Sequence, residues 1–422
     1  MTPPAAWFQE ARFGLFVHWG HYAQHGWEAS WPLVGGNAAL PLCPNVPVGA
    51  YHSSANGFAP RRGSPREWIA LARRAGMRYA VLTAKHHDGF ALFATKRSDF
   101  SVVNGPYRGD IVREFVDATR EAGLRVGLYF SLCDWHHPDY PAFREEDKPY
   151  GARGLPKPTP EQWSRYLDFL FGQIRELLTS YGRIDLLWFD GGWERSAEQW
   201  RARELDEMIR SLQPEIVLND RLPGAGDYAT PEQIVPAKPL PGPWESCLTM
   251  NESWGWVPYD TAYKSARELV HSLCETASRG GNLLLNVSPR GDGTLPPEQV
   301  ERLEAISGWM ERHAASIVGT GPGLEPWQFH GPSTRCGERI FLHLLARPYE
   351  EIAVRGVPVR RVRAVRHLAT GAALEHRERI SALDRALRNP DPVGELRIRV
   401  PEPLLDPLAT VLELEITGPG PG

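Results

Sequence analysis

The sequence has few cysteines, no long hydrophobic run and little excess charge. Its five cysteines are scattered over 422 residues, with no CxxC pair and no Cys/His spacing typical of a zinc site. We therefore expect free thiols in a reducing compartment. No apolar segment approaches the length of a membrane span, so we expect no membrane partner.

The charge and the N-terminus exclude further classes of protein. A formal net charge of -4 gives no sign of a nucleic-acid or anionic-membrane partner. The first residues lack the basic region and the apolar stretch that a secretory signal peptide would have. The expectation is therefore a cytoplasmic protein.

Strand-like and helix-like segments alternate from the N-terminus to about residue 320. Repeated alternation indicates a parallel sheet, and seven such strands within about 300 residues predict an α/β protein with a (β/α)8-like barrel. One strand of that barrel is then short, missing or distorted. The expected strands are Phe13–Trp19, Arg78–Ala84, Arg125–Phe130, Ile184–Asp190, Glu215–Asn219, Ser246–Met250 and Asn282–Val287.

Helix start signals lie between these strands. Ser64 and Thr159 each precede a proline and stand three residues before a Glu or Gln, which predicts an N-cap with a capping box. Asp110 is a further candidate N-cap. The connection from Gly20 to Ser64 is long enough to predict a functional loop, and its Val34–Phe58 part is expected to line outer substrate positions.

The pattern changes near residue 320. Five alternating or β-branched runs follow, separated by Pro, Gly and charged turns, which predicts a small C-terminal antiparallel β-sandwich. We therefore expect a catalytic barrel over residues 1–325 and a sandwich over residues 326–422. The expected C-terminal strands are Arg339–Ala346, Glu351–Val354, Val362–His367, Glu395–Val400 and Thr410–Ile416.

Polar side chains follow the ends of several predicted strands. The most informative is Asp190, because a mostly apolar run ends there abruptly in Asp190-Gly191-Gly192. Carboxylates at the carboxyl ends of barrel strands are typical of active sites. Other strand ends carry His18, His86, His87, Asp134 and Arg221, and Glu245 precedes the sixth strand. We expect these groups to share one edge of the sheet.

Histidines at the strand ends allow two kinds of chemistry. His18, His86, His87 and His136 together carry enough imidazoles for a metal ion. Adjacent residues on an extended chain point to opposite faces, however, which argues against His86 and His87 binding one ion. A neutral imidazole also suits sugar hydroxyls, because it donates and accepts at once. We favour hydroxyl recognition and expect no metal and no cofactor.

Cleavage of a glycoside requires two carboxyl groups, one ionised and one protonated. Asp190 is the candidate nucleophile, and a nearby Arg221 guanidinium would keep it ionised. Glu232 and Glu245 are the candidates for the acid. A loop carboxyl such as Glu232 can fold over the site into a drier environment, although its segment is also compatible with a simple helical turn.

At these residues the chain resembles the α-L-fucosidases of glycoside hydrolase family 29. Five segments carry the resemblance in the family's order, namely Arg12–Gly20, Lys85–Phe90, Leu187–Gly191, Trp244–Trp256 and Gly280–Pro289. The resemblance implies a barrel with a C-terminal sandwich and an exo-acting, retaining enzyme for fucosylated glycans or glycosides. The family is often oligomeric, so a homo-oligomer is one expectation.

The resemblance also implies roles for individual residues. Asp190 matches the nucleophile and Glu232 matches the acid/base, with Glu245 as the alternative. The implied substrate-binding residues are His18, Glu28, His86, His87, Tyr129, Trp188 and Arg221. Fucose is a 6-deoxy sugar, so its methyl group needs an apolar wall of strand-end Phe, Trp or Leu side chains.

Three alternatives stay open at this point. The first is a retaining glycosidase of related specificity, for example for an α-L-galactoside. The second is a fucose-binding protein that has lost catalysis, which would keep the histidines and lose a carboxylate. The third is a metal-dependent hydrolase on the same barrel, whose activity would be sensitive to chelators.

Overall fold

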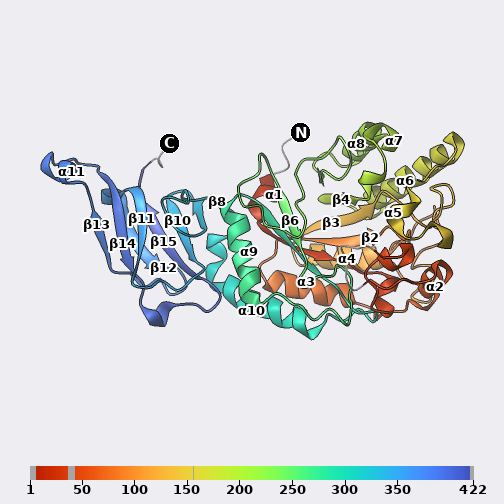
Figure 1. Ribbon diagram of the computed structural model, residues 1–422, viewed down its shortest axis with the longest axis horizontal. Helices are drawn as coiled ribbons and strands as arrows, with labels where there is room; N and C mark the ends of the chain where they lie inside the picture. Colours follow the sequence, from red (N-terminus) through yellow and green to blue (C-terminus); the bar gives the residue numbers. More distant parts are fainter. Residues whose placement is uncertain (1–5, 37–42, 155, 419–422) are drawn as a thin grey trace.

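A computed structural model describes residues 6–36, 43–154 and 156–418 of the chain. Its N-terminal part contains a seven-stranded parallel sheet in the order β5-β4-β3-β2-β1-β7-β6, seen on the right of Figure 1. The strands are β1 (Phe13–Val17), β2 (Tyr79–Lys85), β3 (Arg125–Ser131), β4 (Leu186–Asp190), β5 (Val217–Leu218), β6 (Glu245–Leu248) and β7 (Asn282–Val287).

Helices connect these strands. None of the helices in the described part of the chain is long and apolar enough to cross a membrane. The α-helices are α1 (Ala6–Ala11), α2 (Val48–Ser53), α3 (Ser64–Arg74), α4 (Ile111–Glu121), α5 (Tyr150–Arg153), α6 (Pro160–Ser180), α7 (Ala197–Trp200), α8 (Ala202–Leu212), α9 (Ala266–Ser278), α10 (Pro297–His313) and α11 (Ala382–Ala386).

Every predicted N-terminal strand forms, and nearly all of their residues are buried. Burial on both faces explains the near-continuous apolar runs, because alternate strand residues pack into two different apolar clusters, one on each face of the sheet. β4 pairs with β3 through Asp190, which lies opposite Ser131. The register therefore brings Asp190 to the carboxyl edge of the sheet, as the sequence predicts.

The gap between β5 and β6 is bridged by an extended segment of residues 228–232. Isolated parallel bridges join Asn219 to Tyr228 on one side, and Ala229 to Trp244 and Glu232 to Cys247 on the other. The Glu245 amide donates to the Ala229 carbonyl at 2.9 Å. This segment carries Glu232 to the same edge of the sheet as Asp190.

Two of the three expected N-caps are confirmed. Thr159 caps α6 with a reciprocal bond from Gln162, and the Asp110 carboxylate accepts from the Arg113 amide at the start of α4. The Ser64 cap is wrong. Gly63 occupies the cap position with a positive φ of 79°, and the Ser64 hydroxyl turns back to the Arg61 carbonyl. The left-handed conformation of Gly63 shifts the start of α3 by one residue.

The C-terminal part contains two antiparallel sheets, on the left of Figure 1. All five expected strands form, and the two sheets share a second apolar core. No apolar pattern in the sequence predicts β8, β9 and β13, because these strands are short or largely polar. The strands are β8 (Gly321–Pro322), β9 (Ser333–Cys336), β10 (Arg339–Leu344), β11 (Glu351–Pro358), β12 (Val362–His367), β13 (His376–Arg379), β14 (Val393–Arg399) and β15 (Thr410–Ile416).

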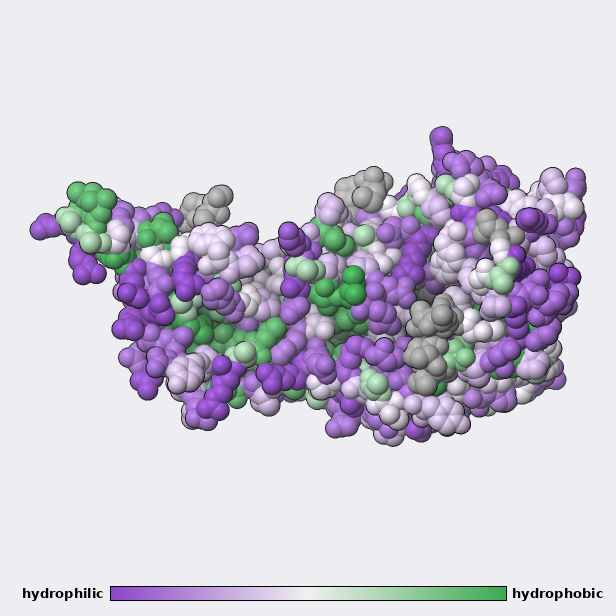
Figure 2. All heavy atoms as spheres, in the orientation of Figure 1, coloured by the Kyte–Doolittle hydropathy of each residue, from purple (hydrophilic) through white to green (hydrophobic). Residues whose placement is uncertain are grey.

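Helices α9 and α10 lie between the parallel sheet and the C-terminal sheets (Figure 1). The main core continues across this junction to Phe341 and Val411. The face shown in Figure 2 is largely hydrophilic, with an apolar patch at the end of the molecule where α11 lies. Leu383 and Leu387 are exposed there.

Candidate active site

A cavity of about 110 Å³ opens at the carboxyl edge of the parallel sheet. Eight of the ten residues that the sequence predicts for the site line it, and four further aromatic residues complete the lining. The predicted ones are His18, His86, His87, Tyr129, Trp188, Asp190, Arg221 and Glu232, and the additional ones are Phe16, Trp31, Trp193 and Trp254.

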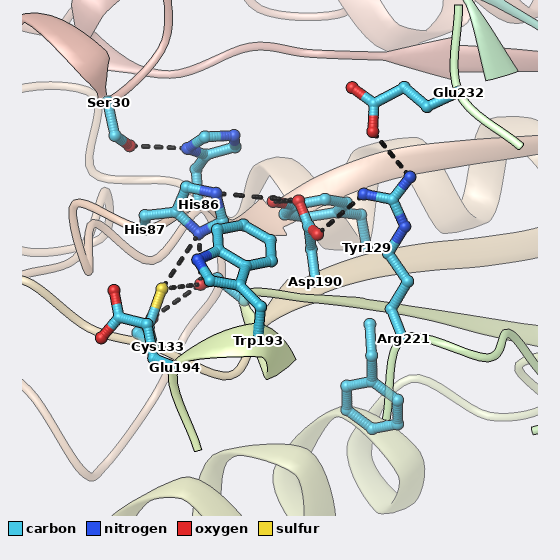
Figure 3. A network of polar contacts seen from close by, with 12 residues as sticks. Ser30, His86, His87, Tyr129, Cys133, Asp190, Trp193, Glu194, Arg221 and Glu232 are labelled. Carbon is cyan, nitrogen blue, oxygen red and sulfur yellow. Dashed lines mark hydrogen bonds and ion pairs between the residues drawn. The ribbon is translucent and has the colours of Figure 1, made fainter. Parts of the chain in front are cut away.

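Asp190 is held by two donors at the base of this cavity (Figure 3). Tyr129, on β3, donates its hydroxyl to Asp190 Oδ2 at 2.9 Å, and Arg221 Nη1 donates to Oδ1 at 3.0 Å. Burial opposes the charge of Arg221, but Asp190 and Glu232 outweigh it and raise the pKa of the guanidinium. The carboxylate is therefore fixed in orientation beside a permanent positive charge.

Glu232 is joined to Asp190 through the same guanidinium. Arg221 Nη2 donates to Glu232 Oε2 at 2.7 Å, so one planar group separates the two carboxylates. The Glu232 side chain is 39% exposed, which is wetter than the sequence analysis expects for an acid folded over the site. The isolated bridge between Glu232 and Cys247 holds the Glu232 backbone against β6 and leaves the Glu232 side chain at the open rim of the cavity.

Glu245 lies beneath the cavity and does not line it. It is fully buried at the start of β6 and accepts from Trp188 Nε1 at 3.0 Å, from the Tyr228 hydroxyl at 3.4 Å and from the Tyr79 hydroxyl. Burial raises the pKa of Glu245 to about 7, against the opposing effect of these three donors. Its position makes it a support for the Trp188 indole.

Glu28 also lies outside the cavity lining. It is buried, and its two oxygens accept from the backbone amides of Trp254 at 2.7 Å and Gly255 at 2.8 Å. Burial raises the pKa of Glu28 to about 8, partly offset by these bonds. The carboxyl group therefore fixes the loop that presents Trp254 to the cavity.

The expectation that His86 and His87 face opposite sides is wrong. Both rings line the cavity, with centroids 4.2 Å apart. The alternation rule applies only within a strand, and β2 ends at Lys85. The chain then turns, with the Gly89 amide donating to the His86 carbonyl, so the two side chains project to the same side.

Each cavity histidine has its Nδ1 atom engaged outside the cavity. His18 Nδ1 lies 2.7 Å from Asn286 Oδ1, His86 Nδ1 lies 2.6 Å from Ser30 Oγ, and His87 Nδ1 lies 2.7 Å from Ser131 Oγ. Ser131 donates its own proton to the Cys133 carbonyl, so it accepts from His87. The Nε2 atoms remain for the cavity, and that of His87 lies 3.7 Å from Asp190 Oδ2.

These three imidazoles are neutral. Burial is the largest cause, and it lowers the pKa of His18, of His86 and of His87 to about 3 in each case. A neutral ring whose Nδ1 is engaged presents one defined Nε2 group, which either donates or accepts. The arrangement suits a row of hydroxyl groups. Among the described residues, no three His, Cys, Asp or Glu side chains form a group that would hold a metal ion.

The aromatic lining is larger than the sequence analysis anticipated. Phe16, Trp188 and Tyr129 pack together, with centroid distances of 5.2 Å between Phe16 and Trp188 and 5.6 Å between Tyr129 and Trp188. Trp254 adds its ring 4.8 Å from that of His18. Phe16 stands between two apolar residues of β1, so the local sequence does not distinguish it from a residue of the core. Trp193 had a signal, because it follows the Gly191-Gly192 turn after the acid.

Comparison with known proteins identifies the family of this chain. The model of the family described as α-L-fucosidase matches residues 2–315. The chain belongs to this α-L-fucosidase family. Tissue α-L-fucosidase of Homo sapiens is 31% identical, over 81% of this chain and 76% of the relative. Membership makes the protein a glycoside hydrolase, as the resemblance in the sequence implies.

Solved α-L-fucosidase structures match both parts of the chain. Isoenzyme 1 from Paenibacillus thiaminolyticus is 37% identical, covers 98% of both chains and has a TM-score of 0.84. A Bacteroides thetaiotaomicron enzyme, solved as a trapped covalent intermediate, is 25% identical with a TM-score of 0.79, covering 97% of this chain and 95% of its own. The similarity therefore extends through the C-terminal sheets.

Proposed function

We propose that this α-L-fucosidase hydrolyses terminal α-L-fucosides with Asp190 as the nucleophile and Glu232 as the acid/base. The observation that carries the assignment is the Arg221 guanidinium, which bonds to both carboxylates. Retaining glycosidases need their two carboxyl groups about 5–5.5 Å apart, and one guanidinium between them is compatible with that separation.

In the first step, Asp190 attacks the anomeric carbon while Glu232 donates a proton to the leaving oxygen. The bond to the leaving group breaks and a fucosyl-aspartate ester forms. In the second step, Glu232 removes a proton from water, which attacks the same carbon and releases fucose with retained configuration. A bound glycoside would cover the exposed side of Glu232 and exclude water from it.

The neutral Nε2 groups of His18, His86 and His87 would bind the sugar hydroxyls, with Arg221 as a further donor. Phe16, Trp188 and Trp254 would form the wall for the fucose methyl group. A sugar with a 6-hydroxyl would leave that group without a partner against the wall, which disfavours an α-L-galactoside. Glu28 and Glu245 would act indirectly, by holding Trp254 and Trp188 in place.

We extend the proposal to the architecture. The segment of residues 228–232 would serve as the remaining member of a (β/α)8-like barrel, because its bridges to Asn219 and to Trp244 lie between the two edges of the sheet. A barrel over residues 1–325 and a C-terminal sandwich over residues 326–422 would then form the two domains. β8 (Gly321–Pro322) comes before this boundary in the sequence but pairs with β9 in the C-terminal sheet.

Release of 4-nitrophenol from 4-nitrophenyl α-L-fucoside tests the proposed roles. Wild-type enzyme should turn over, and Asp190→Ala should lose at least about 10³-fold in kcat because the covalent step is removed. The α-L-galactoside analogue should react more slowly with the wild type. Near-native turnover by folded Asp190→Ala would exclude Asp190 as the nucleophile, and no turnover by folded wild type would exclude the proposed activity.

A further inference from the structure

Trp193 has an unusual combination of exposure and restraint. Its side chain lines the cavity, yet the residue is 51% exposed, whereas tryptophan is highly buried on average. It lies beside His87 (Figure 3), and the centroids of the two rings are 5.5 Å apart, with 82° between the ring planes. Figure 3 also places Glu232 and Trp193 on different sides of Asp190, so a group attached to the anomeric carbon at Asp190 would extend between the two.

The backbone before Trp193 leaves little freedom for another placement. Gly191 has a φ of 76°, and a Cβ there would lie 2.7 Å from Cys133 Sγ. A Cβ on Gly192 would lie 2.2 Å from the Arg221 carbonyl oxygen. The two glycines therefore allow a tight turn directly after Asp190, and this turn delivers the indole to the mouth of the cavity.

A polar chain fixes the indole from behind. Trp193 Nε1 donates to the Tyr150 hydroxyl at 2.8 Å, and that hydroxyl donates to Glu194 Oε1 at 2.7 Å. Glu194 is buried and also accepts from Trp135 Nε1 at 3.1 Å and from the Tyr140 hydroxyl at 2.5 Å. None of these contacts serves the chemistry at Asp190. They hold one exposed aromatic surface in one orientation.

We propose that Trp193 is the platform for the leaving group, the sugar or aryl ring to which fucose is attached. The proposal rests on the proposed function and deepens it. A flat indole binds the apolar C–H face of a sugar ring or the face of an aryl ring, and fixing it in advance removes the cost of ordering it on binding. Tyr150 and Glu194 are positioning residues that act through Trp193.

Three substrates separate this role from a general effect on the site. α-L-Fucosyl fluoride has a leaving group without a ring, whereas 4-nitrophenyl α-L-fucoside and a fucosylated disaccharide carry one. Trp193→Ala should lower kcat/KM by about tenfold or more for both ringed substrates. It should leave kcat/KM for the fluoride, and inhibition by free L-fucose, within about twofold of the wild type.

Matched variants complete the test. Tyr150→Phe should lower kcat/KM for the ringed substrates by less than Trp193→Ala does, because it keeps the ring and removes only the hydroxyl that orients the indole. Trp193→Phe should retain part of the kcat/KM that Trp193→Ala loses. Trp327→Ala, at an exposed tryptophan in the C-terminal part, should change nothing. Equal losses on the fluoride and the ringed substrates, or no loss on either, would overturn the proposal. Wild-type inactivity on all three would instead refute the proposed function.

Discussion

At the scale of single residues, the cavity depends on histidines that stay neutral. Burial lowers the pKa of His18, His86 and His87 to about 3, and each Nδ1 atom is engaged outside the cavity. The sequence predicts these residues from their positions after strands. It does not predict that the two adjacent ones face the same side, because this depends on the turn that begins after Lys85.

The neutral state predicts how fucose binding depends on pH. A histidine with its pKa near 3 gains no proton between about pH 5 and pH 8, whereas an ordinary one gains it near 6.5. These histidines should therefore add no pH dependence to the affinity for L-fucose over this range, and calorimetry should give wild type and His18→Gln parallel pH profiles, in which Glu28 and Glu245 are the groups that titrate. His18→Gln should bind more weakly at every pH. A loss of affinity centred near pH 6.5 that His18→Gln abolishes would contradict the neutral assignment.

The choice between Glu232 and Glu245 gives a second prediction at this scale. On 4-nitrophenyl α-L-fucoside, Glu232→Ala should be reactivated by azide, which attacks the fucosyl-enzyme without general-base help and yields α-L-fucosyl azide. Glu245→Ala should not be reactivated. It should instead lower the thermal midpoint, because three buried donors lose their acceptor. Azide rescue of Glu245→Ala alone would reverse the assignment.

At the scale of elements, the strands follow directly from sequence and the connections do not. Long apolar runs determine β1 to β4 and β7 because both faces of the sheet are covered. β5 has only two residues, and the segment of residues 228–232 carries no apolar run, so periodicity gives no signal there. Its path is set by pairing with strands on either side.

The loop of residues 34–58 is a second connection whose path the sequence does not give. The sequence predicts that this loop lines outer substrate positions. Residues 37–42 lie outside the described residues, and none of the described residues of the loop lines the cavity.

The loop that carries Trp254 gives a prediction at this scale. Glu28 accepts two backbone amides of that loop, and Glu28→Gln replaces one acceptor by a donor, which leaves one amide unpaired. Above the pKa of about 8, where Glu28 is ionised in the wild type, the loop should shift in the variant, and the inhibition constant of L-fucose should rise about fivefold or more. The control is Glu252→Gln, at an exposed residue two positions before Trp254 in the sequence. Unchanged fucose inhibition in a folded Glu28→Gln enzyme would contradict a supporting role.

At the scale of the whole molecule, three buried histidines meet at the junction of the two parts. His313 ends α10, and His343 and His367 lie on β10 and β12. One ring nitrogen of each has no hydrogen-bond partner. The charged groups that act on them are Asp406 and Arg312, which pair at 2.8 Å. These residues are far apart in sequence, so no local pattern predicts the cluster.

The cluster predicts a loss of stability toward acid. Burial lowers the pKa of His343 to about 3 and that of His313 to about 4, below the ordinary 6.5. As the pH falls below 6.5, the unfolded chain gains protons that the folded chain does not, so the free energy of unfolding decreases. The slope approaches about 1.4 kcal/mol per pH unit for each histidine.

Comparison with a variant isolates this effect from other buried groups, since Glu28 and Glu245, with raised pKa values, act in the opposite direction. His343→Gln removes one such proton difference. The stability advantage of the wild type over this variant, measured by denaturant unfolding, should shrink by about 1–2 kcal/mol from pH 7 to pH 5. The matched control is His330→Gln, at an exposed side chain. A constant wild-type advantage across this range would show that His343 gains its proton in the folded protein over the same pH range as in the unfolded chain, and with it that the junction accommodates a charge that its apolar surroundings should exclude.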